Sequence, residues 1–588
     1  MHIEGGRDLG ENIKIADDEI VWTRGYSDDY WNDPVSPLFF ELLGDQLTQI
    51  VNVELNEIMG YSKPGTNKTD KLLRLYRAHA YFNLEVLKRK VEYEIPPFVR
   101  NNDILNYFQE GKGQYGKETM KKQPFRLTKR AMAEIRVMLH DGNGSITKTA
   151  SAYEAWTKEQ FEPFYEKFDA RMGRLSQDDA SGYIELATEL DRLMIRHFRL
   201  VRYGIPVHNI GMNLIAQYLL GRFLGKEDAA ASYPALLSGL RHKTSETNDA
   251  LFRLASTILT SPRLRAIILE TPSNRLLARL KIEGSPASAR FSAELESFFK
   301  DFGVRGFTRE PYYPRWHEAP EHIFNILKTI VQDEDPEGRL GRKQGRDETA
   351  EKEIEDRVKS QRAGRVKWAL FSTVLNFARK YIVFRENQRF NLDRWITMNR
   401  KLYLAIGRNF QNRKILSEPS DIFFLRKNEI RGLAEGKFTS CKTEEIKRVV
   451  GERKAEFLRD ENVTPPKFLR GNCELDDPAQ SYKTELTGIP ASQGVLTGPV
   501  RVLDRIDDIW RVRTGEILVV PRTDPGWTPV FGKIGGLITE TGGLLSHGAV
   551  VSREYRIPAV TNIPNACRIF KTGQTVTIDG SKGTVRIN

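Results

Sequence analysis

One histidine, His547, follows two glycines and a serine in the stretch TETGGLLSHGAVVSREYRIPAV at residues 539–560. Gly542 and Gly543 allow a backbone turn that residues with a Cβ atom resist. Ser546 is a favourable N-cap, so the spacing predicts a short helix that begins at His547 and stops before the Ile-Pro pair. Free N–H groups and the helix dipole favour a neutral imidazole and a bound anion at that position. His547 can therefore be a nucleophile that accepts a phosphoryl group, although a capping or packing role also fits these residues.

Polar clusters in the helical part of the chain supply candidates for a second site. They lie in RHFRLVRYGIPVHN, in GVRGFTREPYYPRWHE and in FRENQRF. Guanidinium groups bind phosphoryl oxygens in a fixed fork geometry, and aromatic neighbours suit an organic acceptor. Each cluster taken alone also fits a surface ion pair. The acceptor-site candidates are Arg305, Glu310, Arg315, Trp316, Arg385, Glu386 and His208.

Two glycine-rich stretches resemble ligand-binding loops but lack the residues that such loops need. GKGQYGKE at residues 111–118 has Glu118 where a phosphate loop needs Ser or Thr for magnesium. Its flanks predict a helix before it and a poor helix start after it, which indicates a flexible basic loop. DGNGS at residues 141–145 has Ala152 at the position of the last calcium ligand, which indicates a turn.

Other metal and hydrolase signatures are absent from the sequence. It contains no HExxH and no GxSxG pattern, which removes the usual support for a zinc or serine hydrolase. The three cysteines have no CxxC spacing, which argues against both a zinc site and a disulfide framework. We therefore expect this chain to bind no metal, and we expect a reducing cytoplasm as its location.

Composition indicates a multidomain globular protein. The chain has 588 residues, of which 40% are hydrophobic and 29% charged. It has neither an apolar N-terminal segment nor a run of about 18 apolar residues, so we expect no membrane association. The net charge of +12 would suit nucleic acid. However, the basic residues are interleaved with acidic ones, and a positive field also attracts phosphorylated compounds or an acidic partner. We therefore expect no nucleic-acid ligand.

Hydrophobic patterning changes near residue 470. Apolar residues recur every three to four positions in KLLRLYRAHAYFNLEVLKRK, GMNLIAQYLLGRFLG, NDALFRLASTIL and FSTVLNFARKYIVF, which predicts helices. Short β-rich runs such as GVLTGPVRVL, GEILVVP and QTVTIDG follow later. The expected fold is a large, mainly α-helical N-terminal region plus a C-terminal α/β domain. The expected segments are a helical region at 1–330, a charged linker or helix at 331–365, further helices at 366–470, a hinge linker at 471–485 and the α/β domain at 486–588.

The C-terminal stretches resemble the swivelling phosphohistidine domain of the phosphoenolpyruvate-utilising enzymes. The resemblance rests on GIPASQGVLTGPVRV, TDPGWTPVFGKIGGLITETGGLLSHGAVVSREYRIPAV and GQTVTIDGSKGTV, which occur in the family's order and spacing. DPGWTP and GGLLSHGA are most similar to the rifampicin phosphotransferase branch. VWTRGYSDDYWNDPVSPLFF, GVRGFTREPYYPRWHEAP and FRENQRFNLDRW resemble, more weakly, the helical acceptor domain of that branch. The resemblance implies that His547 is phosphorylated and that its loop is supported by Gly542, Gly543, Ser546 and Gly548.

The resemblance also implies a division of labour between subunits. Multidomain relatives carry an N-terminal ATP-grasp domain, and neither that domain nor the phosphoenolpyruvate barrel is recognisable in this sequence. In phenylphosphate synthase the nucleotide-binding unit is a separate subunit. We therefore expect a separate ATP-grasp subunit to bind ATP and Mg²⁺, with no cofactor bound by this chain itself.

The implied reaction is that of a dikinase. ATP would yield AMP and phosphate, and His547 would carry the phosphoryl group to a small hydroxylated organic acceptor, with phenols ahead of other compounds. The hinge would let the domain move between the two sites. Transfer to pyruvate or to an antibiotic is the alternative within the family. A regulatory homologue without catalysis is the alternative outside it.

Overall fold

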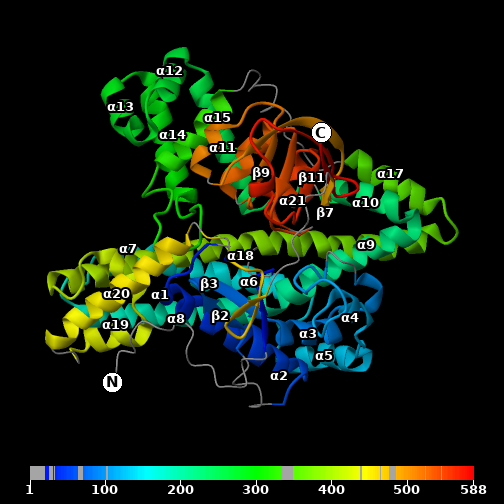
Figure 1. Cartoon of the computed structure of the whole chain (residues 1–588), viewed down its shortest axis with the longest axis horizontal. Coiled ribbons are helices and arrows are strands. Elements are labelled where there is room, and N and C mark those ends of the chain that lie inside the picture. Colours follow the sequence, from blue (N-terminus) through cyan, green and yellow to red (C-terminus); the bar gives the residue numbers. More distant parts are fainter. Residues whose placement is uncertain are drawn as a thin grey trace. The chain divides into compact units, whose positions relative to one another are not determined.

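The computed structural model describes residues 20–25, 31, 33–63, 71–100, 104–237, 239–332, 348–436, 440–461, 463, 465–475, 485–504, 506–523, 525–543 and 546–588. The chain divides into two compact units, each assembled from three stretches of sequence (Figure 1). Unit 1 comprises Met1–Gly211, Thr308–Tyr313 and Asn391–Ala479. Unit 2 comprises Met212–Phe307, Pro314–Phe390 and Gln480–Asn588.

Unit 1 contains a five-stranded antiparallel sheet with the order β2-β3-β1-β4-β5. Its strands are β1 (Val21–Thr23), β2 (Leu73–Tyr76), β3 (His79–Asn83), β4 (Phe468–Arg470) and β5 (Cys473–Leu475). The sheet joins residues from the two ends of this unit's sequence, since β1 pairs with both β3 and β4.

The helix expected through KLLRLYRAHAYFNLEVLKRK is wrong in its first half. Arg77 and Ala78 have φ values of 47° and 51° and form the two-residue turn of the β2–β3 hairpin. Helix α3 (Leu84–Tyr93) begins only after Asn83, whose side chain accepts a hydrogen bond from the Glu85 N–H group. The apolar spacing misled because pairing with a distant strand overrides local periodicity.

Helices make up most of the rest of unit 1. Their bounds are α1 (Pro37–Phe39), α2 (Leu55–Met59), α4 (Lys117–Lys122), α5 (Leu127–His140), α6 (Thr149–Trp156), α7 (Glu162–Met172), α8 (Ala180–Tyr203), α19 (Lys427–Ala434) and α20 (Ser440–Asp460). Short helical turns continue several of them, namely η3 (Phe40–Gly44), η4 (Leu47–Glu54), η5 (Pro97–Val99), η6 (Thr157–Phe161), η7 (Gly204–Asn209) and η9 (Pro419–Phe424).

The N-terminal part of unit 2 is also helical. It contains α9 (Ile210–Leu224), α10 (Lys226–Leu236), α11 (Lys243–Leu259), α12 (Pro262–Glu270), η8 (Ser273–Arg275), α13 (Leu276–Glu283), α14 (Pro286–Phe302), α15 (Glu321–Val331) and α17 (Glu348–Lys359). The long helix α18 (Gly364–Asn412) contributes its first residues to unit 2 and its last residues to unit 1. In the part of the chain that the structure describes, no helix is both long and apolar enough to cross a bilayer.

The C-terminal part of unit 2 is an eight-stranded mixed sheet with the order β6-β13-β12-β8-β9-β10-β11-β7. The four central strands β8 to β11 run parallel, and the outer pairs are antiparallel. The strands are β6 (Glu485–Thr487), β7 (Ile489–Ser492), β8 (Val495–Val502), β9 (Ile517–Val520), β10 (Gly536–Thr539), β11 (Ala559–Thr561), β12 (Thr575–Asp579) and β13 (Thr584–Ile587).

The two faces of this sheet have separate hydrophobic cores. Leu518 and Val520 of β9 pack against residues of η10 (Ile506–Arg511), η11 (Pro525–Gly532) and α21 (His547–Glu554). Ile517 and Val519 face the opposite side, where α22 (Ala566–Ile569) lies. This alternation is the two-residue period of a strand that is buried on both faces.

The expected fold class is confirmed, since a mainly helical N-terminal region precedes a C-terminal α/β domain. Two of the expected segments fall partly outside the described residues. In the segment 331–365, residues 333–347 are not among them, and α17 follows as a helix. In the hinge expected at 471–485, residues 476–484 are not among them. The hinge therefore stays a prediction.

Candidate active site

Helix α21 begins as the sequence predicts. Ser546 is its N-cap and accepts a hydrogen bond from the Ala549 N–H group, so His547 is the first helical residue. Gly542 has a φ of 115°, and a Cβ atom there would lie 2.9 Å from Oγ of Ser546. The carbonyl of Gly543 accepts the Ser546 N–H at 2.9 Å. The two glycines therefore leave room for the cap and hold the turn that presents His547.

Two threonine hydroxyls contact the two ring nitrogens of His547. Oγ1 of Thr523 lies 3.3 Å from Nδ1, and Oγ1 of Thr528 lies 3.2 Å from Nε2. Phe531 meets the imidazole edge-on, with 6.3 Å between the ring centroids. Thr523 follows β9 and His547 follows β10, and the carboxyl ends of these neighbouring parallel strands meet at one edge of the sheet.

Burial and nearby arginines keep His547 neutral. Burial is the main cause that lowers its pKa to about 3. Arg389, Arg305 and Arg385 lower the pKa further, whereas Glu386 acts in the opposite direction. A neutral imidazole has a lone pair available for attack on phosphorus. The positive groups around it suit the oxygens of a phosphoryl group.

Glu386 is the anion within this arginine cluster. Burial raises its pKa, but Arg385 and Arg389 outweigh burial and hold that pKa well below the usual value. Its Oε1 lies 3.4 Å from Nη1 of Arg385 and 3.8 Å from Nη1 of Arg389. Its Oε2 accepts a hydrogen bond of 2.9 Å from Oγ1 of Thr244. Glu386 is thus ionised and firmly placed.

Aromatic surface lies beside the same cluster. The guanidinium of Arg305 stacks over the ring of Phe390 at 5.1 Å, and Nζ of Lys243 lies 5.8 Å from the same ring. Phe302 is 6.2 Å from Phe390. The surroundings of Arg305 therefore combine positive charge with an apolar wall.

Of the seven acceptor-site candidates, three lie among the charges that act on His547. They are Arg305, Arg385 and Glu386. Two others belong to unit 2 as buried packing residues. Trp316 stacks on Phe298 with 6.2 Å between centroids, and the Arg315 side chain is 1% exposed.

The remaining two candidates belong to unit 1. Glu310 accepts hydrogen bonds from the backbone N–H and the hydroxyl of Ser36, at 2.9 and 2.7 Å. His208 lies 2.9 Å from the carbonyl oxygen of Gly144, and burial lowers its pKa. These two residues therefore belong to a different unit from His547.

Three residues of the site were not considered in the sequence, namely His242, Thr523 and Thr528, whereas Arg389 was a member of the FRENQRF cluster. Arg389 stands in the FRENQRF segment, and both threonines stand in TDPGWTP, so their neighbourhood was visible in the sequence. His242 in LRHKTSETND had no such signal, because only the packing of α11 against α18 brings it to the cluster.

The glycine motif at residues 111–118 forms a loop of bends and turns, and the poor helix start expected after it is wrong. The Gln109 N–H group donates to the Tyr115 carbonyl at 3.0 Å, which closes a tight turn, and α4 begins at Lys117. The ammonium of Lys117 is buried and bonded to Glu110. The expected helix before the motif is also wrong, since turns occupy residues 104–107. Close approach of Gly116 to Gly111 explains the turn, because a Cβ atom at 116 would meet the Gly111 carbonyl oxygen at 2.3 Å.

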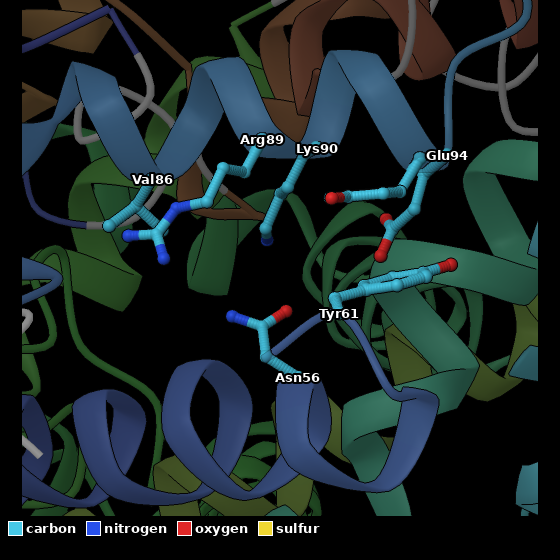
Figure 2. Close-up of a pocket in the computed structure, with 7 residues that line it drawn as sticks. Asn56, Tyr61, Val86, Arg89, Lys90 and Glu94 are labelled. Atoms are coloured by element: carbon cyan, nitrogen blue, oxygen red, sulfur yellow. The ribbon is translucent and has the colours of Figure 1, made fainter. Parts of the chain in front are cut away.

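Unit 1 has a pocket of its own (Figure 2). Its cavity volume is only about 10 Å³. Helix α3 supplies Arg89 and Lys90, and Glu94 follows as its C-cap. The stacked rings of Tyr61 and Tyr93 lie 4.3 Å apart. Among the described residues of the whole chain, no group of three or more His, Cys, Asp or Glu side chains is arranged to hold a metal ion.

Two family models match stretches of the chain that contain residues of this site. The model "Rifampicin phosphotransferase fourth domain" matches residues 203–386, and the model "PEP-utilising enzyme, mobile domain" matches residues 512–583. The chain is a PEP-utilising enzyme family member related to rifampicin phosphotransferase. The resemblance stated from the sequence is thereby confirmed. Within this family, the mobile-domain match contains His547, and the fourth-domain match contains Arg305, Arg385 and Glu386.

The chain aligns with only part of the length of each similar protein. It is 28% identical over 385 residues to the rifampicin phosphotransferase of Bacillus subtilis (strain 168), covering 63% of this chain and 42% of the relative. It is 27% identical to the prodigiosin synthesizing transferase PigC of Serratia marcescens, covering 63% and 41%. It is 23% identical to the uncharacterized phosphotransferase YvkC of Bacillus subtilis (strain 168), covering 72% and 51%. The chain therefore spans about half the length of these relatives or less.

Proposed function

We propose that this chain is the phosphoryl-carrying and acceptor-binding component of a phosphotransferase. His547 takes a phosphoryl group from a separate ATP-binding partner and passes it to a small hydroxylated organic acceptor. The observation that carries the proposal is the electrostatic environment of His547. A neutral imidazole at a helix start lies within the influence of three arginines and one glutamate of the helical part of the same unit.

The proposed transfer needs positioning and charge neutralisation more than covalent chemistry. The bond between phosphorus and the His547 nitrogen breaks, and a bond between phosphorus and the acceptor oxygen forms. Arg305, Arg385 and Arg389 neutralise the phosphoryl oxygens during this exchange. The hydroxyl proton of the acceptor replaces the phosphoryl group on the imidazole, which takes up the electron pair of the broken N–P bond. His547 leaves as a neutral ring, as its lowered pKa favours.

The donor in this proposal is ATP with Mg²⁺ on a partner that contains an ATP-grasp domain. Two observations support a donor outside the described residues. The only P-loop-like sequence is a closed turn whose lysine is bonded to Glu110. The chain also spans only 42% of the rifampicin phosphotransferase of Bacillus subtilis, so more than half of that relative has no counterpart in the aligned sequence.

A phenol-like acceptor is the class that the cluster favours. Phe390 and Phe302 supply an apolar wall beside Arg305, and a guanidinium there would stabilise a phenolate oxygen. A macrocyclic antibiotic is the second candidate, because residues 203–386 match the rifampicin phosphotransferase fourth domain. Pyruvate is the third candidate, because it has no aromatic ring that could pack against these phenylalanines.

The test separates carrier from acceptor. The full chain is treated with phosphoramidate, a small donor that phosphorylates histidine, and the phosphohistidine is followed by ³¹P NMR after adding phenol, pyruvate or rifampicin. We expect an acid-labile, base-stable signal that is absent from His547→Ala and is discharged fastest by phenol. A normal signal in His547→Ala refutes the carrier role. Discharge by pyruvate alone refutes the phenol assignment and leaves the carrier role standing.

A matched pair of variants checks that the arginine cluster forms the acceptor site. Arg385→Ala should load like the wild type and discharge more slowly, because one positive group is lost from the transfer site. Arg290→Ala is the control, since Arg290 lies in the same unit and forms an exposed pair with Glu294. Equal discharge rates in both variants would place the acceptor elsewhere.

A further inference from the structure

His242 caps the helix that faces Glu386. It precedes α11, and its Nδ1 accepts a hydrogen bond of 3.3 Å from the Ser245 N–H group. The His242 N–H group in turn donates to Oγ of Ser245 at 3.0 Å, which completes a capping box. The start of α11 is therefore tied to the imidazole of His242.

This cap determines which ring nitrogen of His242 carries the proton. A backbone N–H group can only donate, so Nδ1 must keep its lone pair, and in a neutral ring the proton then resides on Nε2. Burial lowers the pKa of His242, and Arg305 and Arg385 oppose protonation further, although Glu386 and Glu246 act the other way. His242 is thus a neutral ring with one fixed N–H donor.

Two hydrogen bonds hold this donor against the candidate active site. The Lys243 N–H group donates to Oδ1 of Asn387 at 3.0 Å, and Oγ1 of Thr244 donates to Oε2 of Glu386 at 2.9 Å. Both acceptors lie on α18, next to Arg385. His242 is therefore fixed beside the same charged groups that act on His547.

The donor on Nε2 has no acceptor within the described residues. The His242 side chain is only 5% exposed, and its interactions are those of the cap and of the neighbouring charges. Nε2 is not among the fully buried side-chain atoms that lack a hydrogen bond, so this fixed donor remains accessible to a ligand. The surrounding charges are those that suit a phosphoryl group.

We propose that the Nε2–H group of His242 donates a hydrogen bond to an oxygen of the phosphoryl group while that group leaves His547. The proposal rests on the carrier role of His547. No proton changes hands at His242, because Nε2 already holds its proton and Nδ1 is occupied by the cap. The residue contributes a preorganised donor that adds to the arginines, and such donors act on the charge of the transition state.

The first test reads the tautomer and the contact by ¹⁵N-histidine NMR of the full chain. We expect a protonated Nε2 and an unprotonated Nδ1 for His242 at neutral pH. Phosphorylation of His547 with phosphoramidate should shift the His242 Nε2 proton downfield. The same treatment of His547→Ala should leave that proton in place. An unprotonated Nε2, or an unchanged proton after loading, overturns the inference.

The second test reads the rate at which loaded protein loses its phosphoryl group to water. His242→Asn keeps a preferred N-cap residue but cannot offer the imidazole N–H group. We expect loss about 10- to 100-fold slower than in the wild type, the usual effect of one hydrogen bond to a charged group. Ser245→Ala is the control for the cap and should lose the group at the wild-type rate.

The outcomes separate this inference from the function on which it rests. If the wild-type chain does not hold a phosphoryl group on His547, the carrier proposal fails, and this inference fails with it. If the chain is loaded but His242→Asn loses the group at the wild-type rate, only the role of His242 is refuted.

Discussion

A Cβ atom at position 548 would lie 2.6 Å from Oγ1 of Thr523, the hydroxyl that contacts Nδ1 of His547. Gly548 is the second residue of α21, so its missing side chain is what lets the helix start approach the loop after β9. The same Cβ would also lie 3.0 Å from Cδ2 of Leu537 in β10. The geometry of the histidine therefore depends on a glycine in the next position.

The first prediction concerns this contact. Gly548→Ala should destabilise the protein by about 1–3 kcal/mol, the usual cost of overpacking, and should slow phosphorylation of His547. Gly451→Ala is the matched control within helix α20, where nothing lies within 4 Å of the new Cβ. That control should be stabilising by about 0.5–1 kcal/mol. Urea unfolding of both variants provides the comparison, and equal shifts in the same direction would contradict the steric explanation.

The second prediction uses two substitutions with opposite effects on His547. Arg389 lowers the pKa of His547 and Glu386 raises it. Arg389→Gln should therefore raise that pKa, and Glu386→Gln should lower it. An NMR titration of the His547 ring measures both. Shifts of the same sign in the two variants would show that the cluster does not act on His547 as described.

The third prediction is a pH dependence of stability. The folded-state pKa of His547 is lowered to about 3 by burial, whereas an ordinary histidine titrates near 6.5. Between these values the unfolded chain binds a proton that the folded chain does not, so the free energy of unfolding falls as pH falls from about 6.5. His547→Gln should show a shallower decline. Thermal unfolding from pH 7 to pH 5 tests this, and parallel curves would contradict it.

The fourth prediction contrasts two arginines that share one carboxylate in unit 1. Arg202 is buried and bonds to Glu54 at 2.9 Å and to Asp141 at 2.8 Å. Arg199 bonds to the same Glu54 at 2.8 Å but is 54% exposed. Arg202→Met should cost about 1.5–3 kcal/mol, because the buried guanidinium makes charge-assisted hydrogen bonds to both carboxylates. Arg199→Met should cost less than about 1 kcal/mol. Chemical denaturation measures both, and similar costs would refute the role assigned to burial.

Local signals were enough to predict the start of α21. Ser546 as cap, the glycine turn before it and the Ile-Pro stop are all properties of adjacent residues, and the structure confirms them. The strand-rich C-terminal domain was likewise visible from β-branched runs between glycines. The secondary structure of these elements is determined by residues that are adjacent in the sequence.

Contacts between distant residues were not predictable in the same way. The hairpin of β2 and β3 was interpreted as a helix because its apolar spacing fits both the helix period and the strand period. The strand that pairs with β3 on its other side is β1, which is distant in the sequence. Thr523 and Thr528 reach His547 only because β9 and β10 are parallel neighbours. His242 reaches the cluster through helix packing alone. The order of residues along one sequence does not indicate such tertiary contacts.

The placement of β1 in unit 1 has a consequence for synthesis on the ribosome. This strand lies between β3 and β4, and Trp22 pairs with Leu469 near the far end of the chain. At about 5–20 residues per second, β4 emerges roughly 20–90 s after β1. During that interval one edge of β1 has no strand to pair with, and unpaired edges associate with other chains. Nascent chains that end before β4 are therefore the species most in need of a chaperone.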